Sequence, residues 1–184
     1  MNKIVRYIFS LFEKTVVKVN GWKHIPNSPR KFMYVVTQKY NGKDIQLSDG
    51  TMVTKGDFVA EFHIDNLKMN QVKNDLKSIF RYLDEELIAL AEAAITHEEF
   101  KNIKAYYGRT VLHPIAKKRD FTIIDVENKK FFLKFWDNLL KLVFQSSNSK
   151  GTKKFRDPKE CWISKEQLGR FLSKKGDYNE KENN

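Results

Sequence analysis

Two side chains that can exchange protons stand two residues apart in the sequence, Glu61 and His63. The run from Phe58 to Ile64 alternates between two sets of residues and is rich in aromatic and β-branched types, which predicts a β-strand. Alternate side chains of a strand share a face, so Glu61 and His63 lie on one face, about 7 Å apart. A carboxylate beside an imidazole can orient its tautomer and raise its basicity, which suits general acid–base chemistry. Asn66 could hold a carbonyl or hydroxyl of a ligand.

The same residues also have a structural interpretation. Asp65 or Asn66 can cap the helix expected from Leu67 to Ala94, since both types accept hydrogen bonds from the first free N–H groups of a helix. His63 can then pack where the sheet meets that helix. Both interpretations stay open at the level of sequence.

His113 is a second histidine that could converge with Glu61 and His63. Together they would form a facial set with one carboxylate, but no His-x-His or His-Glu-x-x-His spacing supports a metal site. The sequence also lacks a phosphate-binding loop, a Gly-x-Gly-x-x-Gly run and a Gly-x-Ser-x-Gly run. We therefore expect neither a metal nor another cofactor.

A basic segment follows the aromatic pair before Gly108 and suggests anion binding. Its candidate residues are Arg109, Lys117, Lys118 and Arg119. Guanidinium groups bind phosphate well because they offer several N–H donors in a plane. The alternative is that Gly108 ends a helix and that these charges are solvated.

The net charge of +11 favours an anionic partner, such as phosphate groups or an anionic membrane surface. The excess of Lys and Arg lies in residues 1–60 and 101–156, whereas residues 61–100 are acidic. Two basic amphipathic helices are expected at residues 2–19 and 130–145, which can lie on a membrane or form core. The basic loop at residues 150–156 could touch nucleic acid, but no known nucleic-acid module surrounds it, so this partner is the weakest alternative.

Cellular location is inferred from what the sequence lacks. No window of about 18 uncharged residues and no cleavable signal segment is present. The single cysteine, Cys161, excludes an intrachain disulfide, and we interpret it as a buried structural thiol. We expect a cytoplasmic protein, with peripheral contact to a membrane as an option.

The hydrophobic pattern predicts an α+β fold, with a small antiparallel hairpin or meander packed against several helices. The long helix Leu67–Ala94 is the expected central element, because its apolar residues recur at steps of three or four. Residues 1–173 form one domain, and residues 174–184 form a disordered polar tail. The other expected strands are Phe32–Lys39, Ile45–Leu47, Met52–Thr54 and Phe121–Val126, and the other expected helices are Thr96–Tyr107, Thr110–Lys118 and Ser164–Ser173.

Several short blocks resemble the YkoP-like family of small bacterial proteins, which also occurs as a domain appended to some polysaccharide deacetylases. The blocks are Leu47-Ser-Asp-Gly-Thr51, Lys55-Gly-Asp57 with Glu61-Phe-His63, Tyr107-Gly-Arg-Thr-Val-Leu-His113, and Trp162-Ile-Ser-Lys-Glu-Gln-Leu168. Two positions depart from the family pattern: Phe62 replaces a leucine, and Asp120 replaces a glycine in the turn before Phe121. The resemblance implies a link to cell-envelope carbohydrate or lipid-linked sugars, and no established activity.

These observations leave open whether the protein is an enzyme. The first hypothesis is a non-catalytic binding or accessory domain that recognises a polar, anionic, envelope-related ligand where the Leu47–Asp65 hairpin ends. The second is an acid–base hydrolase or transferase with His63 as base and Glu61 as orienting residue. An enzyme needs another polar group to converge on His63, and the candidates are Arg81, Tyr82, Glu85 and His113. Nonspecific nucleic-acid binding through the basic flanks is the third and weakest hypothesis.

Overall fold

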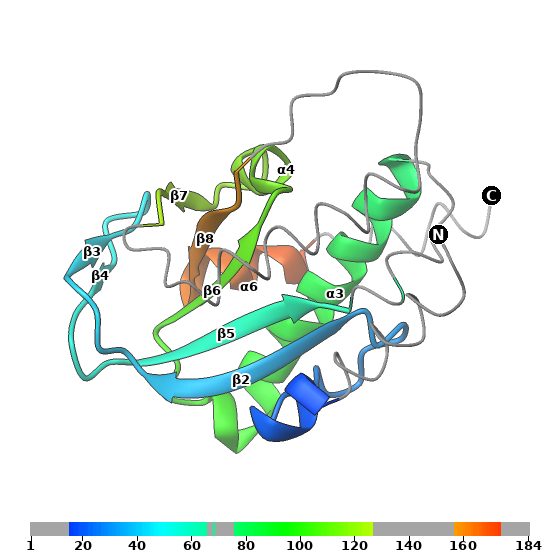
Figure 1. Ribbon diagram of the computed structural model, residues 1–184, viewed down its shortest axis with the longest axis horizontal. Coiled ribbons are helices and arrows are strands. Elements are labelled where there is room, and N and C mark those ends of the chain that lie inside the picture. The colour runs from blue at the N-terminus through cyan, green and yellow to red at the C-terminus, as the bar shows by residue number, and fades with distance from the viewer. Residues whose placement is uncertain (1–14, 66–67, 69–75, 127–156, 174–184) are drawn as a thin grey trace.

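A computed structural model describes residues 15–65, 68, 76–126 and 157–173. Its main feature is a six-stranded sheet (Figure 1). In spatial order the strands are β1 (Lys23–His24), β2 (Met33–Lys39), β5 (Phe58–Ile64), β6 (Ala105–Thr110), β8 (Lys159–Ser164) and β7 (Thr122–Ile124). All neighbouring pairs are antiparallel except β5 and β6, which are parallel.

The remaining elements are one small hairpin and several helices. The hairpin consists of β3 (Ile45–Gln46) and β4 (Met52–Val53), which pair only with each other among the described strands. The helices are α3 (Leu76–Thr96), α4 (His113–Lys117) and α6 (Lys165–Gly169), together with the 3₁₀ turns η1 (Glu98–Phe100) and η2 (Arg170–Leu172).

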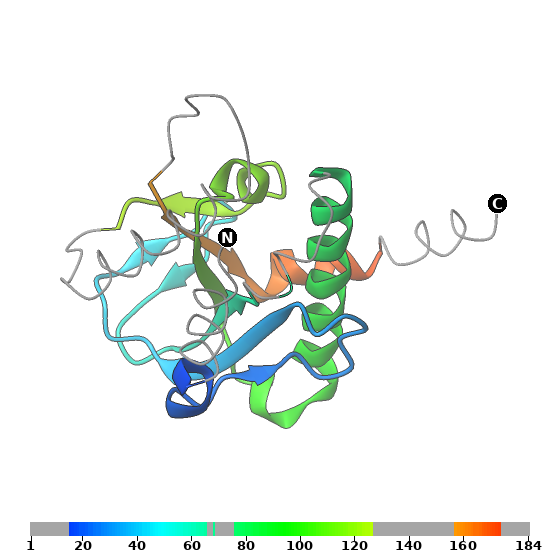
Figure 2. The same ribbon diagram turned by 45° about the vertical axis from the view of Figure 1, so that its right-hand side comes forward.

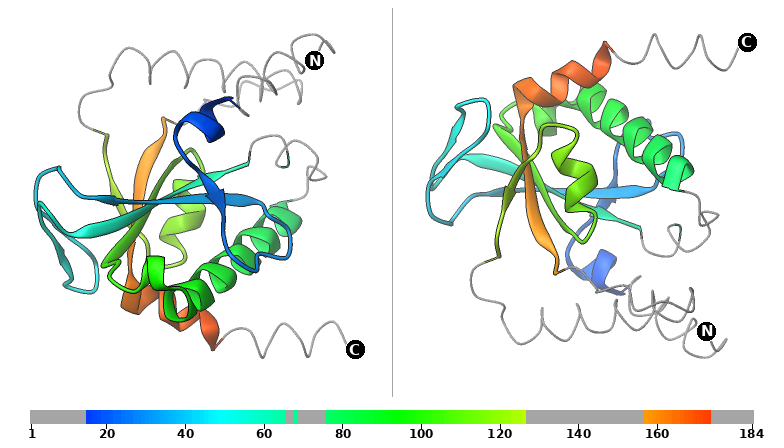
Figure 3. Two further views of the ribbon diagram at one scale, coloured as in Figure 1. Left: turned by 90° about the horizontal axis from the view of Figure 1, so that it is seen from below. Right: turned by 90° about the horizontal axis from the view of Figure 1, so that it is seen from above.

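Helix α3 lies across one face of the sheet, with α6 beside it (Figure 2). The alternation of β5 explains this packing, because Ala60 and Phe62 point toward α3 and join the main core. The other large members of this core are Phe32, Met33, Leu90, Phe100, Tyr106, Ile163 and Leu168. Figure 3 shows α3 and α6 on one side of the sheet and the helical turn at residues 15–19 on the other.

The second face of the sheet is covered at one end by the β3–β4 hairpin. Leu47 and Val53 of this hairpin region pack on Val59, Ala105 and Trp162, and all five are buried. The small core on this face is therefore separate from the core under α3.

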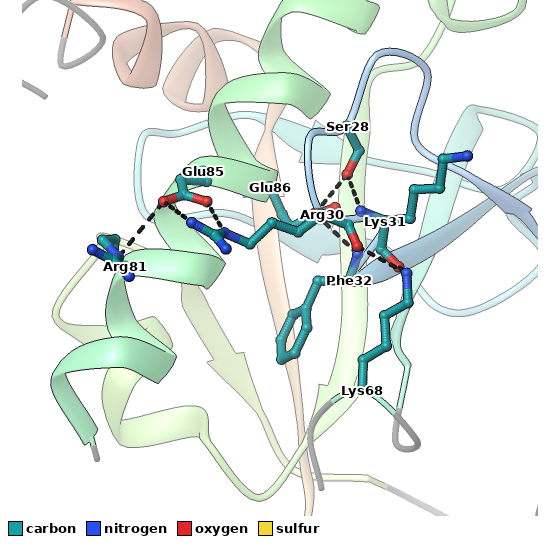
Figure 4. Close-up of polar contacts among 8 residues, drawn as sticks. All are labelled: Ser28, Arg30, Lys31, Phe32, Lys68, Arg81, Glu85 and Glu86. Carbon is teal, nitrogen blue, oxygen red and sulfur yellow. Dashed lines mark hydrogen bonds and ion pairs between the residues drawn. The ribbon is translucent and has the colours of Figure 1, made fainter. Parts of the chain in front are cut away.

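A buried glutamate of α3 fixes the loop between β1 and β2 (Figure 4). Glu86 is 0% exposed, and its Oε1 accepts hydrogen bonds from the Ser28 hydroxyl at 2.5 Å and from the Phe32 backbone N–H at 3.0 Å. Burial raises the pKa of Glu86, while the hydrogen bonds from Ser28 and Phe32 and the charge of Lys68 act in the opposite direction. The loop is thus pinned to α3 just before β2 begins.

Charged side chains surround this anchor. Arg30 forms an ion pair and two hydrogen bonds with Glu85, and it also lies over the Tyr82 ring at 4.0 Å from the ring centroid. Lys68 donates to the backbone carbonyls of Arg30 and Lys31 at 2.8 Å each. Figure 4 shows these side chains arranged around the same loop.

The mixed α and β composition expected from the sequence is confirmed, and the sheet is mostly antiparallel as expected, but it is larger than expected. The sheet has six strands and includes a parallel pair, and β4 pairs with β3 rather than with β5. The segment 47–65 is therefore not one hairpin. Strand β5 instead pairs with β2 on one side and with β6 on the other. Neither neighbour directly precedes or follows β5 in the chain.

The helix expected over residues 96–107 is also wrong. Thr96 does not cap a new helix, since its hydroxyl donates to the Glu92 carbonyl of α3 at 2.8 Å. The chain makes only the short turn η1 and then enters β6. Pairing on both sides, with β5 and β8, outweighs the local resemblance to a helix end.

Helix starts were predicted better. Ser164 and Gln167 form a capping box at the start of α6, where the helix Ser164–Ser173 was expected to begin. Asp65 accepts a hydrogen bond from the Lys68 N–H at 3.0 Å, as expected of a cap. Helix α3 overlaps the predicted segment Leu67–Ala94 from Leu76 onward and ends two residues after it, while residues 67 and 69–75 are outside the described residues.

Other expectations concern residues that the structure does not describe. These are most of the helix at residues 2–19, the helix at residues 130–145, the basic loop at residues 150–156 and the tail at residues 174–184. Within the ranges that are described, no helix is both long and apolar enough to cross a membrane.

Candidate functional site

Glu61 and His63 lie on the face of β5 that points away from α3. The register places Glu61 opposite Val36 of β2 and Tyr107 of β6, and it places His63 opposite Tyr34. The strand alternation predicted from the sequence therefore brings the acid and the imidazole to the same face.

Glu61 is the centre of a small hydrogen-bond network. Its Oε2 accepts from the Tyr107 hydroxyl at 3.0 Å and from Gln38 Nε2 at 3.2 Å. Gln38 also donates to the Tyr107 oxygen at 2.6 Å. Burial raises the pKa of Glu61 and the nearby charge of Glu160 adds to this, while the bonds from Tyr107 and Gln38 oppose it.

His63 stands beside the other oxygen of Glu61. The distance from His63 Nε2 to Glu61 Oε1 is 3.3 Å, but the imidazole ring is not aligned for a hydrogen bond, and this buried nitrogen has no hydrogen-bond partner among the described residues. The ring stacks on Trp22 with centroids 3.6 Å apart. Burial lowers the pKa of His63 to about 4, so the ring is neutral at pH 7.

Aromatic side chains flank both ends of this network. On the β1 side, Trp22 covers His63, and His24 stacks on Tyr34 with centroids 4.3 Å apart. We call the four residues Gln38, Glu61, His63 and Tyr107 the polar strip. Glu61 and His63 are partly exposed to solvent, with side-chain exposures of 26% and 22%.

The other end of the polar strip adjoins the small core under the β3–β4 hairpin. Tyr107 stacks on Trp162 at 4.2 Å between centroids, and Tyr40 meets Trp162 edge-on. The indole N–H of Trp162 donates to Glu160 at 3.1 Å. Burial raises the pKa of Tyr107, and the neighbouring Glu61 and Glu160 raise it further, so its hydroxyl stays protonated as a donor.

This arrangement supplies hydrogen-bond acceptors and flat aromatic surfaces. Glu61 has one saturated oxygen and one oxygen beside His63, which has an unused nitrogen. A neutral imidazole next to a carboxyl group of raised pKa can also exchange protons. In the described part of the chain no three His, Cys, Asp or Glu side chains come together as a metal site.

The polar groups expected to converge on His63 are elsewhere. Arg81, Tyr82 and Glu85 lie on α3, which covers the opposite face of the sheet. His113 begins α4, and its charge acts on Asp125. The groups that do converge are Tyr107 and Gln38, from the strands on either side of β5. Asn66 is outside the described residues.

The four residues expected to bind an anion are not brought together. Arg109 is half-buried on the face of the polar strip, opposite Glu160 in the register. Arg119 instead binds Asp84 of α3 through two hydrogen bonds of 2.5 and 2.8 Å. The remaining two, Lys117 and Lys118, are exposed near the end of α4.

A cavity of about 180 Å³ lies next to Arg119. It is bounded by Arg119, Asp120, Gln167, Arg170, Phe171 and Ser173. Arg119 of this lining is paired with Asp84, and Asp120 adds a carboxyl group to the lining.

The sequence pattern missed Trp22, Gln38 and Tyr107 as members of the site. The sequence pattern places Tyr107 at a helix end, whereas the segment Ala105–Thr110 is a strand. Only its parallel pairing with β5 brings Tyr107 beside Glu61. Trp22 and Gln38 carry no local signal. They reach the strip only because β1 pairs with β2 and β2 pairs with β5.

Most of the remaining motif residues hold the fold together. Asp49 accepts from the Ser164 hydroxyl at 2.5 Å and from the Thr51 N–H at 3.0 Å. Gln167 donates to the Ser48 hydroxyl at 3.0 Å. The blocks around residues 47–51 and 162–168 thus meet at one hydrogen-bonded junction, which explains their residue types without a ligand.

Comparisons with known proteins identify relatives. A family model described as YkoP domain matches residues 2–171. The chain is 23% identical over 158 residues to a Bacillus subtilis (strain 168) protein named "Uncharacterized protein YkoP". The aligned region covers 82% of this chain and 86% of that protein. No solved structure matches the chain. Neither name states a substrate, a ligand or an activity.

Proposed function

The chain belongs to the YkoP family, and from this premise we propose that it is a non-catalytic binding or accessory domain whose polar strip holds a polar ligand. The observation that carries the proposal is the unused nitrogen of His63, which is buried beside Glu61. Buried polar atoms in native proteins nearly always have a partner, so an orphan beside an otherwise satisfied network suggests a missing ligand group or water.

The surroundings of the strip support a ligand of some size. Stacked pairs of aromatic rings lie at both ends, Trp22 on His63 and Tyr107 on Trp162. Aromatic surfaces combined with a few fixed polar groups are typical of sites for small molecules. The resemblance to domains of polysaccharide deacetylases favours an envelope-related saccharide or lipid-linked sugar as the ligand class.

The net charge of +11 supports a ligand that also carries negative groups, or binding at an anionic membrane surface. Such groups would lie outside the polar strip, near Arg109 or the exposed lysines of α4. The proposal keeps the protein in the cytoplasm, with peripheral membrane contact, and it does not involve nucleic acid.

An acid–base enzyme is the second candidate, because Glu61 and His63 are adjacent and their pKa values are shifted toward each other. In that case His63 would accept a proton from the substrate, and Glu61 would orient or protonate the imidazole ring. The stacking of His63 on Trp22 favours binding over catalysis, because it restricts the movement of the ring toward a substrate.

Calorimetric titration with defined ligands tests the proposal. The probes are a tetramer of N-acetylglucosamine, a sugar phosphate and vesicles of phosphatidylglycerol. We expect saturable binding of a sugar probe that is weakened at least tenfold by Glu61→Gln and by Tyr107→Phe. The matched control is Glu98→Gln, which changes an exposed glutamate on η1. Binding that is equal in all four proteins would place the ligand elsewhere, and turnover of a probe would favour the enzyme.

A further inference from the structure

Two carboxyl groups of the described residues lie at or beside the polar strip. Glu61 and Glu160 are both half-buried on this face, and Glu160 raises the pKa of Glu61, Tyr107 and Tyr40. His63 is neutral at pH 7. Among the described residues, this part of a chain of net charge +11 therefore holds two carboxyl groups and a neutral imidazole.

Arg109 is the cation closest to this site in the sheet register. It lies opposite Glu160 on β8, one strand away from β5. The groups that set the pKa of Glu61 are burial, Tyr107, Gln38 and Glu160. Arg109 is not among them, and its partner in the register is Glu160 on the neighbouring strand.

The free hydrogen-bonding positions at the site need donors. Glu61 Oε2 already accepts two bonds, whereas Oε1 has only the misaligned His63 nitrogen 3.3 Å away. His63 Nε2 makes no hydrogen bond with the described residues, so it is available as an acceptor when the neutral ring carries its proton on Nδ1. Two acceptors therefore stand side by side without a donor from the described residues.

We infer that the polar strip binds a primary ammonium group of its ligand, which donates to both Glu61 Oε1 and His63 Nε2. An ammonium has three N–H donors and can serve both atoms at once. A hydroxyl has one donor and can serve one of them, and a carboxylate group has no donor and is repelled by Glu61. Hydrogen bonds to a charged partner are also about twice as strong as neutral ones.

This inference rests on the proposed function, since it names the chemistry of a ligand group at the same site. It also restricts where the negative groups of an anionic ligand can lie. Negative groups of the ligand would lie outside the strip, while the part that contacts Glu61 and His63 is positive.

Three sugars that share one pyranose ring test the inference, namely glucosamine, glucose and glucuronate. Each is titrated into the full chain labelled with ¹⁵N, and the side-chain signals of Trp22 and His63 and the backbone signals of β5 are followed by NMR. We expect glucosamine to bind at least about fivefold tighter than glucose and glucuronate not to bind at the strip. Glu61→Gln should reduce the preference for glucosamine to near one, and the control Glu98→Gln should keep it.

The outcomes separate the inference from the proposed function. Binding of glucose or glucuronate at the strip, as tight as that of glucosamine, would overturn the ammonium inference and leave the strip a binding site. A preference for glucosamine that persists in Glu61→Gln would also overturn it. If none of the sugars shifts signals of the strip, both the inference and the saccharide form of the proposed function are wrong.

Discussion

Replacing Glu86 with alanine should destabilise the protein by about 2–4 kcal/mol. The change removes the acceptor of two hydrogen bonds, from Ser28 and Phe32, in a place with no access to water. A buried donor left without a partner costs about 1–3 kcal/mol. The Ser28 hydroxyl also accepts from the Lys31 N–H, so part of the loop turn survives. The expected loss of stability is therefore smaller than two full penalties for unpaired donors.

Glutamine at the same position separates the hydrogen bonds from the charge. Glu86→Gln keeps an acceptor oxygen but cannot ionise. The pKa of Glu86 is raised in the folded state, so the stability from this group is full below the unfolded value of 4.5 and is lost as pH rises through the folded pKa. The stability of Glu86→Gln relative to the natural protein should therefore increase from pH 4.5 upward.

Urea unfolding followed by circular dichroism measures both effects, at a series of pH values from 4.5 to 8. Glu85→Ala is the matched control, because Glu85 is the adjacent residue of α3 and binds Arg30 near the surface. Its loss should cost no more than about 1 kcal/mol. A Glu86→Ala protein within 0.5 kcal/mol (roughly the experimental error) of the natural one, or a Glu85→Ala protein less stable than Glu86→Ala, would refute the anchoring role.

Three further outcomes are expected. Gly108→Ala should destabilise the fold by about 1–3 kcal/mol, because a Cβ would lie 2.3 Å from the Phe62 ring and 2.7 Å from its backbone oxygen; an unchanged urea midpoint would contradict this packing. Asp120 has a φ of 63°, so Asp120→Gly should stabilise by about 0.5 kcal/mol in the same assay, and a clear loss of stability would show that the aspartate side chain has a role of its own. Burial raises the pKa of Cys161 to about 12, so iodoacetamide should modify it about 100-fold more slowly in the folded than in the urea-unfolded protein, and equal rates would mean that β8 opens readily.

The sequence was sufficient for features that depend on local pattern. The alternation of Phe58–Ile64 gave the strand β5 and the shared face of Glu61 and His63, and both are confirmed by the register. The capping box of Ser164 is likewise a local signal, since its two side chains and two N–H groups lie within four residues.

Features that depend on distant pairing were not accessible. Gly108 suggested a helix end, but its small size serves the close approach of Phe62 from β5. No strand was expected at Cys161 and Trp162, just before the expected helix Ser164–Ser173, yet they lie in β8 between β6 and β7. Tyr107 reached Glu61 only through the parallel pairing of β5 and β6, which no short segment encodes.

The departure at Asp120 shows what a family pattern can add. A glycine is usual there, and the positive φ explains why, because glycine adopts this conformation without strain. Aspartate tolerates it better than most residues. The turn before Phe121 is therefore retained, and its carbonyl at residue 120 accepts from Ser48 and Gln167.

The titration of His63 is the most direct test of the polar strip. NMR of the side-chain nitrogens, assigned with His63→Gln, gives its pKa in the full chain. We predict a pKa of about 4, with stability from this neutral ring full above pH 6.5 and lost as pH falls toward 4. A midpoint near 6.5 would show that the imidazole is open to water, and it would contradict a buried site formed by Glu61, His63 and Trp22.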